Sequence, residues 1–89
     1  MSITVIISFE VEDFDKLKSV FDAAEKFRTE AGITAAAYKN MDASNNVRII
    51  GTATSKEAFT AFFSTPAQQE RMKNAGVISP PTVTFLESG

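Results

Sequence analysis

The 89 residues of this chain include no cysteine, no histidine and no tryptophan. Without cysteine, the protein cannot form a disulfide, a thiolate metal site or a cysteine nucleophile. Without histidine, it lacks the side chain that most often serves as general base, metal ligand or haem ligand. The carboxylates, lysines, hydroxyl groups and single tyrosine that remain form no recognisable catalytic set in the sequence. We therefore expect no metal site and no cofactor.

A strong charge of either sign is absent as well, because nine basic and eleven acidic residues give a formal net charge of -2. Such a balance creates no long-range field that would hold a polyanion, so nucleic acid is disfavoured as a partner. No apolar run approaches the length that spans a membrane, and the first residues read as a strand and not as a signal peptide. We therefore expect a cytoplasmic protein without a membrane partner.

The length and apolar content indicate a single domain over residues 1–89. Hydrophobic residues make up 44% of the chain, and eight residues are phenylalanine, so we expect an aromatic core. A domain of this size buries a limited share of its surface, and pairing with a partner would add stability.

The first half of the sequence predicts a strand, a helix and two further strands. Alternating apolar residues indicate a strand over residues 3–11, and spacings of three and four indicate one helix over residues 14–31. Asp13 is expected to cap this helix and Gly32 to end it. Two strands follow, over residues 33–41 and 47–54, and the short polar side chains of residues 42–46 are typical of the turn that joins them.

The second half predicts a broken helix and a closing strand. Ser55 is placed to cap the helix, and Thr65-Pro66 has the form of a new helix start, so we expect a break near Pro66. Gly76 ends the second piece, and residues 82–86 form the last strand. The phenylalanines at helical spacing are predicted to be core residues, and they are Phe14, Phe21, Phe27, Phe59, Phe62 and Phe63.

The order β-α-β-β-α-β predicts an α+β, ferredoxin-like fold, in which two helices cover one face of a four-stranded antiparallel sheet. Strand alternation divides the strand residues between the two faces. Those expected to face the helices are Val5, Ile7, Phe9, Val47, Ile49, Val83 and Phe85. Those expected on the opposite, open face are Ile6, Ser8, Glu10, Tyr38, Asn40, Arg48, Ile50, Thr52, Thr84 and Leu86. The aliphatic residues among them predict that a second copy covers this face and forms a homodimer.

Four residues of the open face are candidate ligand-binding residues, and each has two interpretations. Arg48 can hold a carboxylate or phenolate, or it can pair with Glu10 or with an acid of a second copy. Tyr38 can donate a hydrogen bond to a ligand or pack in the sheet. Asn40 can orient a ligand carbonyl or begin the turn. Glu10 can act as a base if its pKa is raised, or it can simply face solvent.

Over essentially its whole length the chain resembles the dimeric α/β-barrel superfamily, mainly through its C-terminal half. The resemblance rests on the phenylalanine-rich helix, on the break at Ser64-Thr65-Pro66-Ala67 and on the segment from Ala75 to Pro80. It implies two ferredoxin-like sheets paired face to face around a cavity. The superfamily includes antibiotic-biosynthesis-type monooxygenases, haem-degrading enzymes, stress-response barrels and many proteins without assigned activity, so membership implies a dimer before it implies a reaction.

The resemblance leaves three functions to distinguish. The leading hypothesis is a homodimer that binds a small, partly apolar molecule between its sheets. The alternative is a cofactor-independent monooxygenase that acts on a phenolic substrate, since Tyr38, Asn40 and Arg48 are residue types that this branch is thought to use. The third is a structural or interaction module without a ligand. Haem degradation is disfavoured, because the histidine and tryptophan of that branch are missing.

Overall fold

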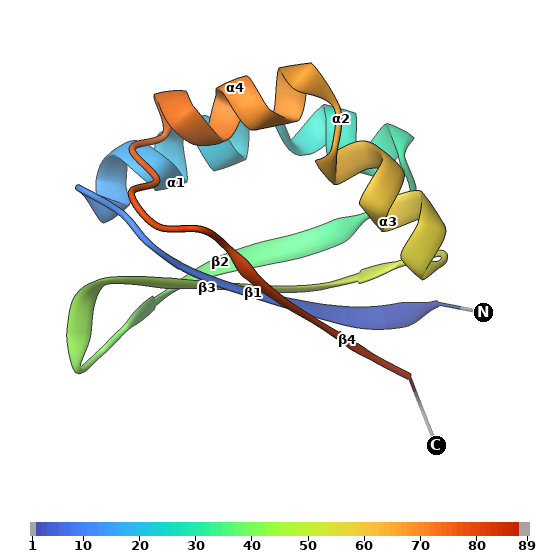
Figure 1. The fold of residues 1–89 in the computed structure, drawn as a ribbon, viewed down its shortest axis with the longest axis horizontal. Helices are drawn as coiled ribbons and strands as arrows, with labels where there is room; N and C mark the ends of the chain where they lie inside the picture. The colour runs from blue at the N-terminus through green and yellow to red at the C-terminus, as the bar shows by residue number, and fades with distance from the viewer. Residues whose placement is uncertain (1, 88–89) are drawn as a thin grey trace.

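The computed structural model describes residues 2–87, which form one four-stranded antiparallel sheet with a layer of helices over one face (Figure 1). The strand order is β2-β3-β1-β4, as expected for the predicted ferredoxin-like fold, which is confirmed. The elements in chain order are β1 (Ile3–Glu10), α1 (Phe14–Ala23), α2 (Glu25–Glu30), β2 (Thr34–Asn40), β3 (Ala43–Ala53), α3 (Lys56–Phe63), α4 (Pro66–Asn74) and β4 (Thr82–Leu86). Within this described part, no helix is long and apolar enough to cross a membrane.

The helices begin where the sequence predicted. The Asp13 side chain accepts a hydrogen bond from the backbone N–H of Asp15 at 3.2 Å, and Ser55 Oγ accepts one from Ala58 at 3.0 Å. The predicted break at Pro66 is also confirmed, because Pro66 is the first residue of α4 and Thr65 caps it. Each cap satisfies an N–H group that has no partner inside its helix.

The first helix differs from the prediction, because it is divided at Ala24 into α1 and α2. The division changes which side chains face the sheet. Phe27, predicted to be a core residue, is 39% exposed, whereas Arg28 is buried. The prediction that Phe27 is a core residue was therefore wrong.

The turn between β2 and β3 is shorter than predicted. Residues 43–46 belong to β3, and only Met41 and Asp42 form the turn. Two polar contacts explain the difference: Asn40 Oδ1 accepts from the Asp42 N–H at 2.9 Å, and Asn40 Nδ2 donates to Asn46 Oδ1 at 3.2 Å. A register irregularity between Lys39 and Asn40 accommodates the tight connection.

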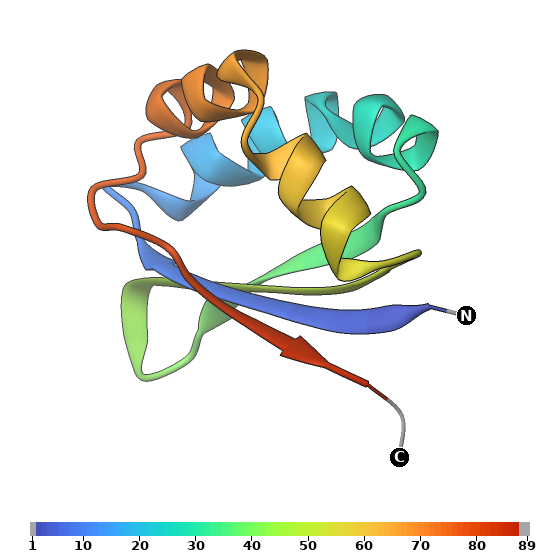
Figure 2. The ribbon, with the colours of Figure 1, turned by 45° about the vertical axis from the view of Figure 1, so that its right-hand side comes forward.

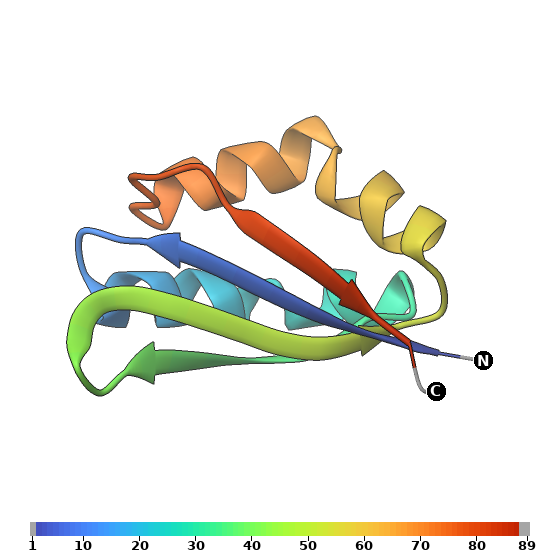
Figure 3. The same cartoon turned by 60° about the horizontal axis from the view of Figure 1, so that its bottom comes forward.

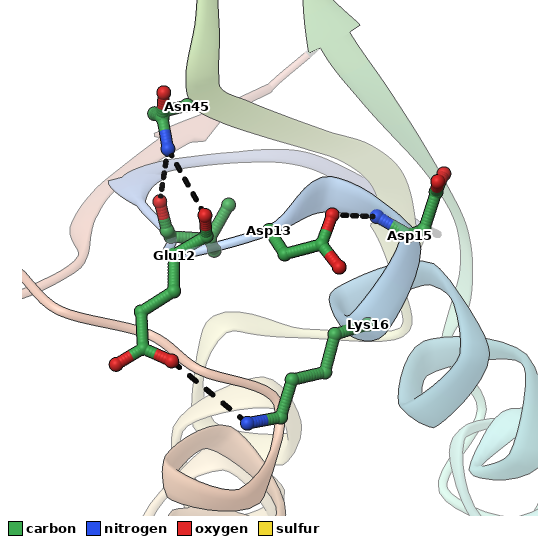
Figure 4. A network of polar contacts seen from close by, with 6 residues as sticks. Glu12, Asp13, Asp15, Lys16 and Asn45 are labelled. Carbon is green, nitrogen blue, oxygen red and sulfur yellow. Dashed lines mark hydrogen bonds and ion pairs between the residues drawn. The ribbon is translucent and has the colours of Figure 1, made fainter.

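The loop between β1 and α1 is held to β3 by Asn45 (Figure 4). Asn45 Nδ2 donates to the carbonyl oxygens of Val11 at 2.8 Å and Glu12 at 3.2 Å. Glu12 forms an ion pair with Lys16 at 3.8 Å, and Asp13 caps α1. The acids of this loop therefore have structural partners.

The core lies between the sheet and the helices, as predicted. Val5, Ile7, Phe9 and Val47 are buried, and Phe59 is the most deeply buried aromatic residue of α3 and α4. The other residues predicted on this face pack against the core, and they are Ile49, Val83 and Phe85. Three of the predicted core phenylalanines are in contact with the same cluster from the helices, namely Phe14, Phe62 and Phe63. The division of the strand residues between the two faces is thus confirmed.

Candidate functional site

No helix of residues 2–87 lies on the open face of the sheet (Figure 3). The strand register arranges its side chains in rows. One row is polar and contains Tyr38, Arg48, Ser8 and Thr82. The next is largely apolar and contains Ala36, Ile50, Ile6 and Thr84. The face therefore joins an aliphatic centre to a polar margin near the β2–β3 turn.

Three of the four predicted ligand-binding residues meet in a shallow hollow of about 340 Å³ on this face. Tyr38, Asn40 and Arg48 line it together with Lys39 and Ile50. Glu10 does not line this hollow, because it lies on β1 opposite Asn46 of β3. The hollow is open to solvent, and Tyr38 is 54% exposed.

The contacts of these residues bear on their two interpretations. Both polar atoms of the Asn40 amide are engaged in the turn, which supports its structural interpretation. Arg48 and Glu10 are exposed and form no ion pair within 4.0 Å, as far as residues 2–87 are concerned. The guanidinium of Arg48 thus remains free to meet an acid of a ligand or of a second copy.

A second hollow region lies on the other side of the sheet, where the helix pairs α1/α2 and α3/α4 lie side by side (Figure 2). It consists of two adjoining hollows of about 50 Å³ each, and we call the two together the helix-side crevice. The walls that both share are Phe21, Arg28, Ile49, Phe63 and Gln68. Phe59 and Phe62 add apolar surface to the first hollow. An apolar crevice with few polar groups has the composition of a small-molecule site.

Arg28 is the unusual wall of the helix-side crevice. Its side chain stacks on Phe21, with 3.6 Å between the guanidinium carbon and the ring centroid, and the residue is 9% exposed. Burial lowers the pKa of this guanidinium, while the nearby acids Glu25 and Asp22 oppose that shift. Its N–H groups donate no hydrogen bond to any acceptor within residues 2–87. Because no side-chain nitrogen among the described residues is both buried and without a partner, the guanidinium nitrogens of Arg28 reach solvent at the crevice.

A second arginine lies at the same crevice. The guanidinium carbon of Arg71 is 4.8 Å from the Phe27 ring centroid and 5.9 Å from that of Phe62. Its Nε donates to Gln68 Oε1 at 3.1 Å. Both arginines line one of the two hollows. The crevice therefore joins aromatic walls to two positive charges.

The sequence analysis did not identify Arg28, Gln68 or Arg71. A signal was present for Arg28, which follows Phe21 by seven residues and Ala24 by four and so falls on the apolar stripe of its helix. A charged residue on such a stripe deserves a functional or packing explanation. Gln68 and Arg71 gave no comparable signal. Among residues 2–87, no group of three or more acidic side chains is placed to hold a metal ion.

Comparison with known proteins shows the fold. No protein-family profile matches the sequence, and no curated protein matches it significantly. Similar solved structures include a candidate antibiotic biosynthesis monooxygenase from Bordetella bronchiseptica, with a TM-score of 0.81, 17% identity, and coverage of 99% of this chain and 97% of that one. SnoaB from Streptomyces nogalater, named a cofactor-independent oxygenase, has a TM-score of 0.74, 18% identity, and coverage of 99% and 95%.

Rv0793 from Mycobacterium tuberculosis is similar as well, with a TM-score of 0.70, 20% identity, and coverage of 99% of this chain and 95% of that one. The predicted resemblance to antibiotic-biosynthesis-type proteins is therefore confirmed at the level of the fold. Because one fold serves many functions, the activity has to be argued from the site.

Proposed function

We propose that this protein binds a small, partly apolar molecule, and that the helix-side crevice is the place where it binds. The observation that carries the proposal is Arg28, a residue only 9% exposed, whose guanidinium lies over the Phe21 ring among the aromatic walls of the crevice. The sequence hypothesis placed the ligand between two sheets, at the hollow of Tyr38, Asn40 and Arg48. That hollow is larger but shallow and open to solvent, so it would enclose a ligand only after a second copy covered it.

A titration with 2-naphthol, followed by the amide resonances of the ¹⁵N-labelled protein, tests this proposal. The expected result is a saturable shift of the amides of Phe21, Phe63 and Gln68, because the ring of the probe would contact the walls of the crevice. Shifts confined to Tyr38 and Arg48 would place the site on the open face instead. If no resonance shifts up to the solubility limit of the probe, the small-molecule proposal is wrong.

A second candidate function is a cofactor-independent oxygenase that acts on a phenol. The likeness to SnoaB favours it, although the two chains are only 18% identical. In this hypothesis Arg48 and Asn40 hold the phenol and Tyr38 assists proton transfer. A measurement of dissolved oxygen in the same titration decides between the two functions. The oxygenase is supported if the wild-type protein consumes oxygen, if Arg48→Ala abolishes this consumption, and if the control variant Lys56→Ala preserves it. Saturable binding without oxygen uptake supports the hypothesis that the protein binds the small molecule without transforming it.

We also propose that two copies pair through their open faces. Ile6 and Ile50 are opposite each other in the apolar row, and Ile50 and Leu86 are 42% and 45% exposed. Aliphatic side chains exposed side by side on an uncovered sheet are typical of an interface. A cavity between the sheets would follow from this pairing.

Replacing Ile50 with lysine is expected to weaken the dimer about a hundredfold. The symmetric interface would lose two buried aliphatic groups, at about 1.5 kcal/mol each, and a factor of ten corresponds to about 1.4 kcal/mol. Light scattering over a dilution series measures the effect, and Ile78→Lys is the matched control, because Ile78 is 60% exposed and lies outside the sheet. A wild-type protein that is monomeric at every concentration would contradict the pairing.

A further inference from the structure

The two arginines of the helix-side crevice present free hydrogen-bond donors in one place. Their guanidinium groups lie over phenylalanine rings, with 3.6 Å from the guanidinium carbon of Arg28 to the Phe21 centroid and 4.8 Å from that of Arg71 to the Phe27 centroid. Stacking of this kind occupies the face of the guanidinium and leaves its N–H edge available. One donor of Arg71 is used by Gln68, and no donor of Arg28 meets an acceptor within residues 2–87.

The acids near this crevice, Glu25 and Asp22, raise the pKa of Arg28, but neither forms a salt bridge with it within 4.0 Å among residues 2–87. Asp22 is engaged with Lys18, whose Nζ lies 2.7 Å from its Oδ1. Glu25 forms no ion pair within 4.0 Å in the described part of the chain. The positive charge of Arg71 lowers the pKa of Arg28. The crevice therefore carries two arginines, whose charge Glu25 and Asp22 offset in part, and its walls are mainly apolar.

The size of the crevice restricts what it holds. Each of the two hollows has a volume of about 50 Å³, and Arg28 and Phe63 belong to the walls of both. Such a hollow accommodates a group of a few atoms, whereas a cavity of about 150 Å³ accommodates benzene. The anionic group of a ligand would fit one hollow directly. The apolar part of the same ligand would enter the other hollow as the side chains shared by both hollows move apart.

We infer that the ligand of the helix-side crevice is a small aromatic carboxylate, whose two oxygen atoms are held by Arg28 and Arg71. The inference rests on the proposed function and adds the chemical class of the ligand. A carboxylate matches the fork of a guanidinium with two parallel hydrogen bonds, whereas a neutral phenol offers only one oxygen atom. The phenylalanine walls supply stacking partners for the ring.

Benzoate and benzamide provide a matched pair of probes, since they have nearly the same shape and differ in charge. Titrated into the ¹⁵N-labelled protein at pH 7, benzoate is expected to bind at least tenfold more tightly than benzamide. Arg28→Met, which keeps a long apolar side chain, is expected to weaken benzoate at least tenfold and leave benzamide unchanged. Lys56→Met is the control, because Lys56 lines neither hollow of the crevice, and it should leave both affinities unchanged.

The outcomes separate this inference from the proposed function. If benzoate and benzamide bind with equal affinity, the carboxylate inference is wrong while the small-molecule site stands. If 2-naphthol binds to the wild-type protein but benzoate and benzamide do not, the carboxylate inference alone is wrong. If none of the three probes binds, the carboxylate inference and the proposed function are both wrong. Should Arg28→Met not fold, Arg71→Met decides, because Arg71 is only partly buried. A loss of at least threefold for benzoate is then expected, and an unchanged affinity would overturn the inference.

Discussion

Phe59→Ala is expected to lower the free energy of unfolding by about 3–5 kcal/mol, the range typical of removing a buried phenylalanine side chain. Phe59 is 5% exposed, stacks on Phe63 with 5.4 Å between ring centroids, and meets the ring of Phe85 edge-on at 5.6 Å. The residue thus joins α3 to β4 across the core. Native domains are stable by only about 5–15 kcal/mol, so the variant would retain little stability.

Urea denaturation followed by circular dichroism measures this effect, and Phe27→Ala is the matched control. Phe27 undergoes the same chemical change but is 39% exposed, so we expect a loss of about 1 kcal/mol or less. Thermal unfolding should give the same order, since 1 kcal/mol corresponds to about 4–8 °C in a domain of this size. Equal losses for the two variants would contradict the assignment of Phe59 to the core and Phe27 to the surface.

Much of the fold was predictable because its signals are local. The caps at Asp13, Ser55 and Thr65 each involve a side chain and an N–H group two or three residues away, so the sequence carries the whole interaction. The glycines that end α2 and α4 have φ angles of 78° and 80°, which other residues rarely adopt. Strand alternation then divided the side chains between the two faces of the sheet.

The errors arose where distant residues decide the geometry. The division at Ala24 has no glycine or proline to signal it, and beyond it Phe27 is exposed while Arg28 is buried. The early start of β3 accompanies the contact of Asn46 with Asn40, and Asn45 also contacts the loop after β1, more than thirty residues away. Local propensity gives no account of such contacts, because tertiary packing overrides it.

The candidate sites show the same difference between local signals, which the sequence reveals, and contacts between distant residues, which it does not. Tyr38, Asn40 and Arg48 meet because antiparallel pairing and strand alternation bring them to one face, and both are local rules. Glu10 was assigned to the correct face but lies outside the hollow, since only the exact register shows Asn46 opposite it. The helix-side crevice was not predicted, because its walls come from helices and strands that are far apart in the sequence. A prediction of sites from sequence is thus stronger for sheets than for broken helices.

Gly51→Ala is expected to destabilise the protein by at least about 3 kcal/mol, the upper part of the range for overpacking. A Cβ atom at Gly51 would lie 2.1 Å from the carbonyl oxygen of Thr34 and 2.7 Å from Cα of Ala35. Both are backbone atoms of β2, so no side-chain rotation relieves the contact. Strand β2 would have to move away from β3 where Gly51 pairs with Ala35, and Gly51 also lines the helix-side crevice.

Gly32→Ala provides the comparison that separates lack of space from backbone strain. Gly32 has a φ of 78°, so alanine there is strained by about 1–2 kcal/mol, but its Cβ would meet only the flexible side chain of Thr54, at 3.0 Å. Gly51 has no positive φ, and its whole penalty comes from crowding against β2. Urea denaturation should therefore show that Gly51→Ala is less stable than Gly32→Ala. Hydrogen exchange in β2 should be faster in Gly51→Ala and unchanged in Gly32→Ala. The reverse order would mean that β2 yields without loss of pairing, and that the close contact of the two strands does not limit this position.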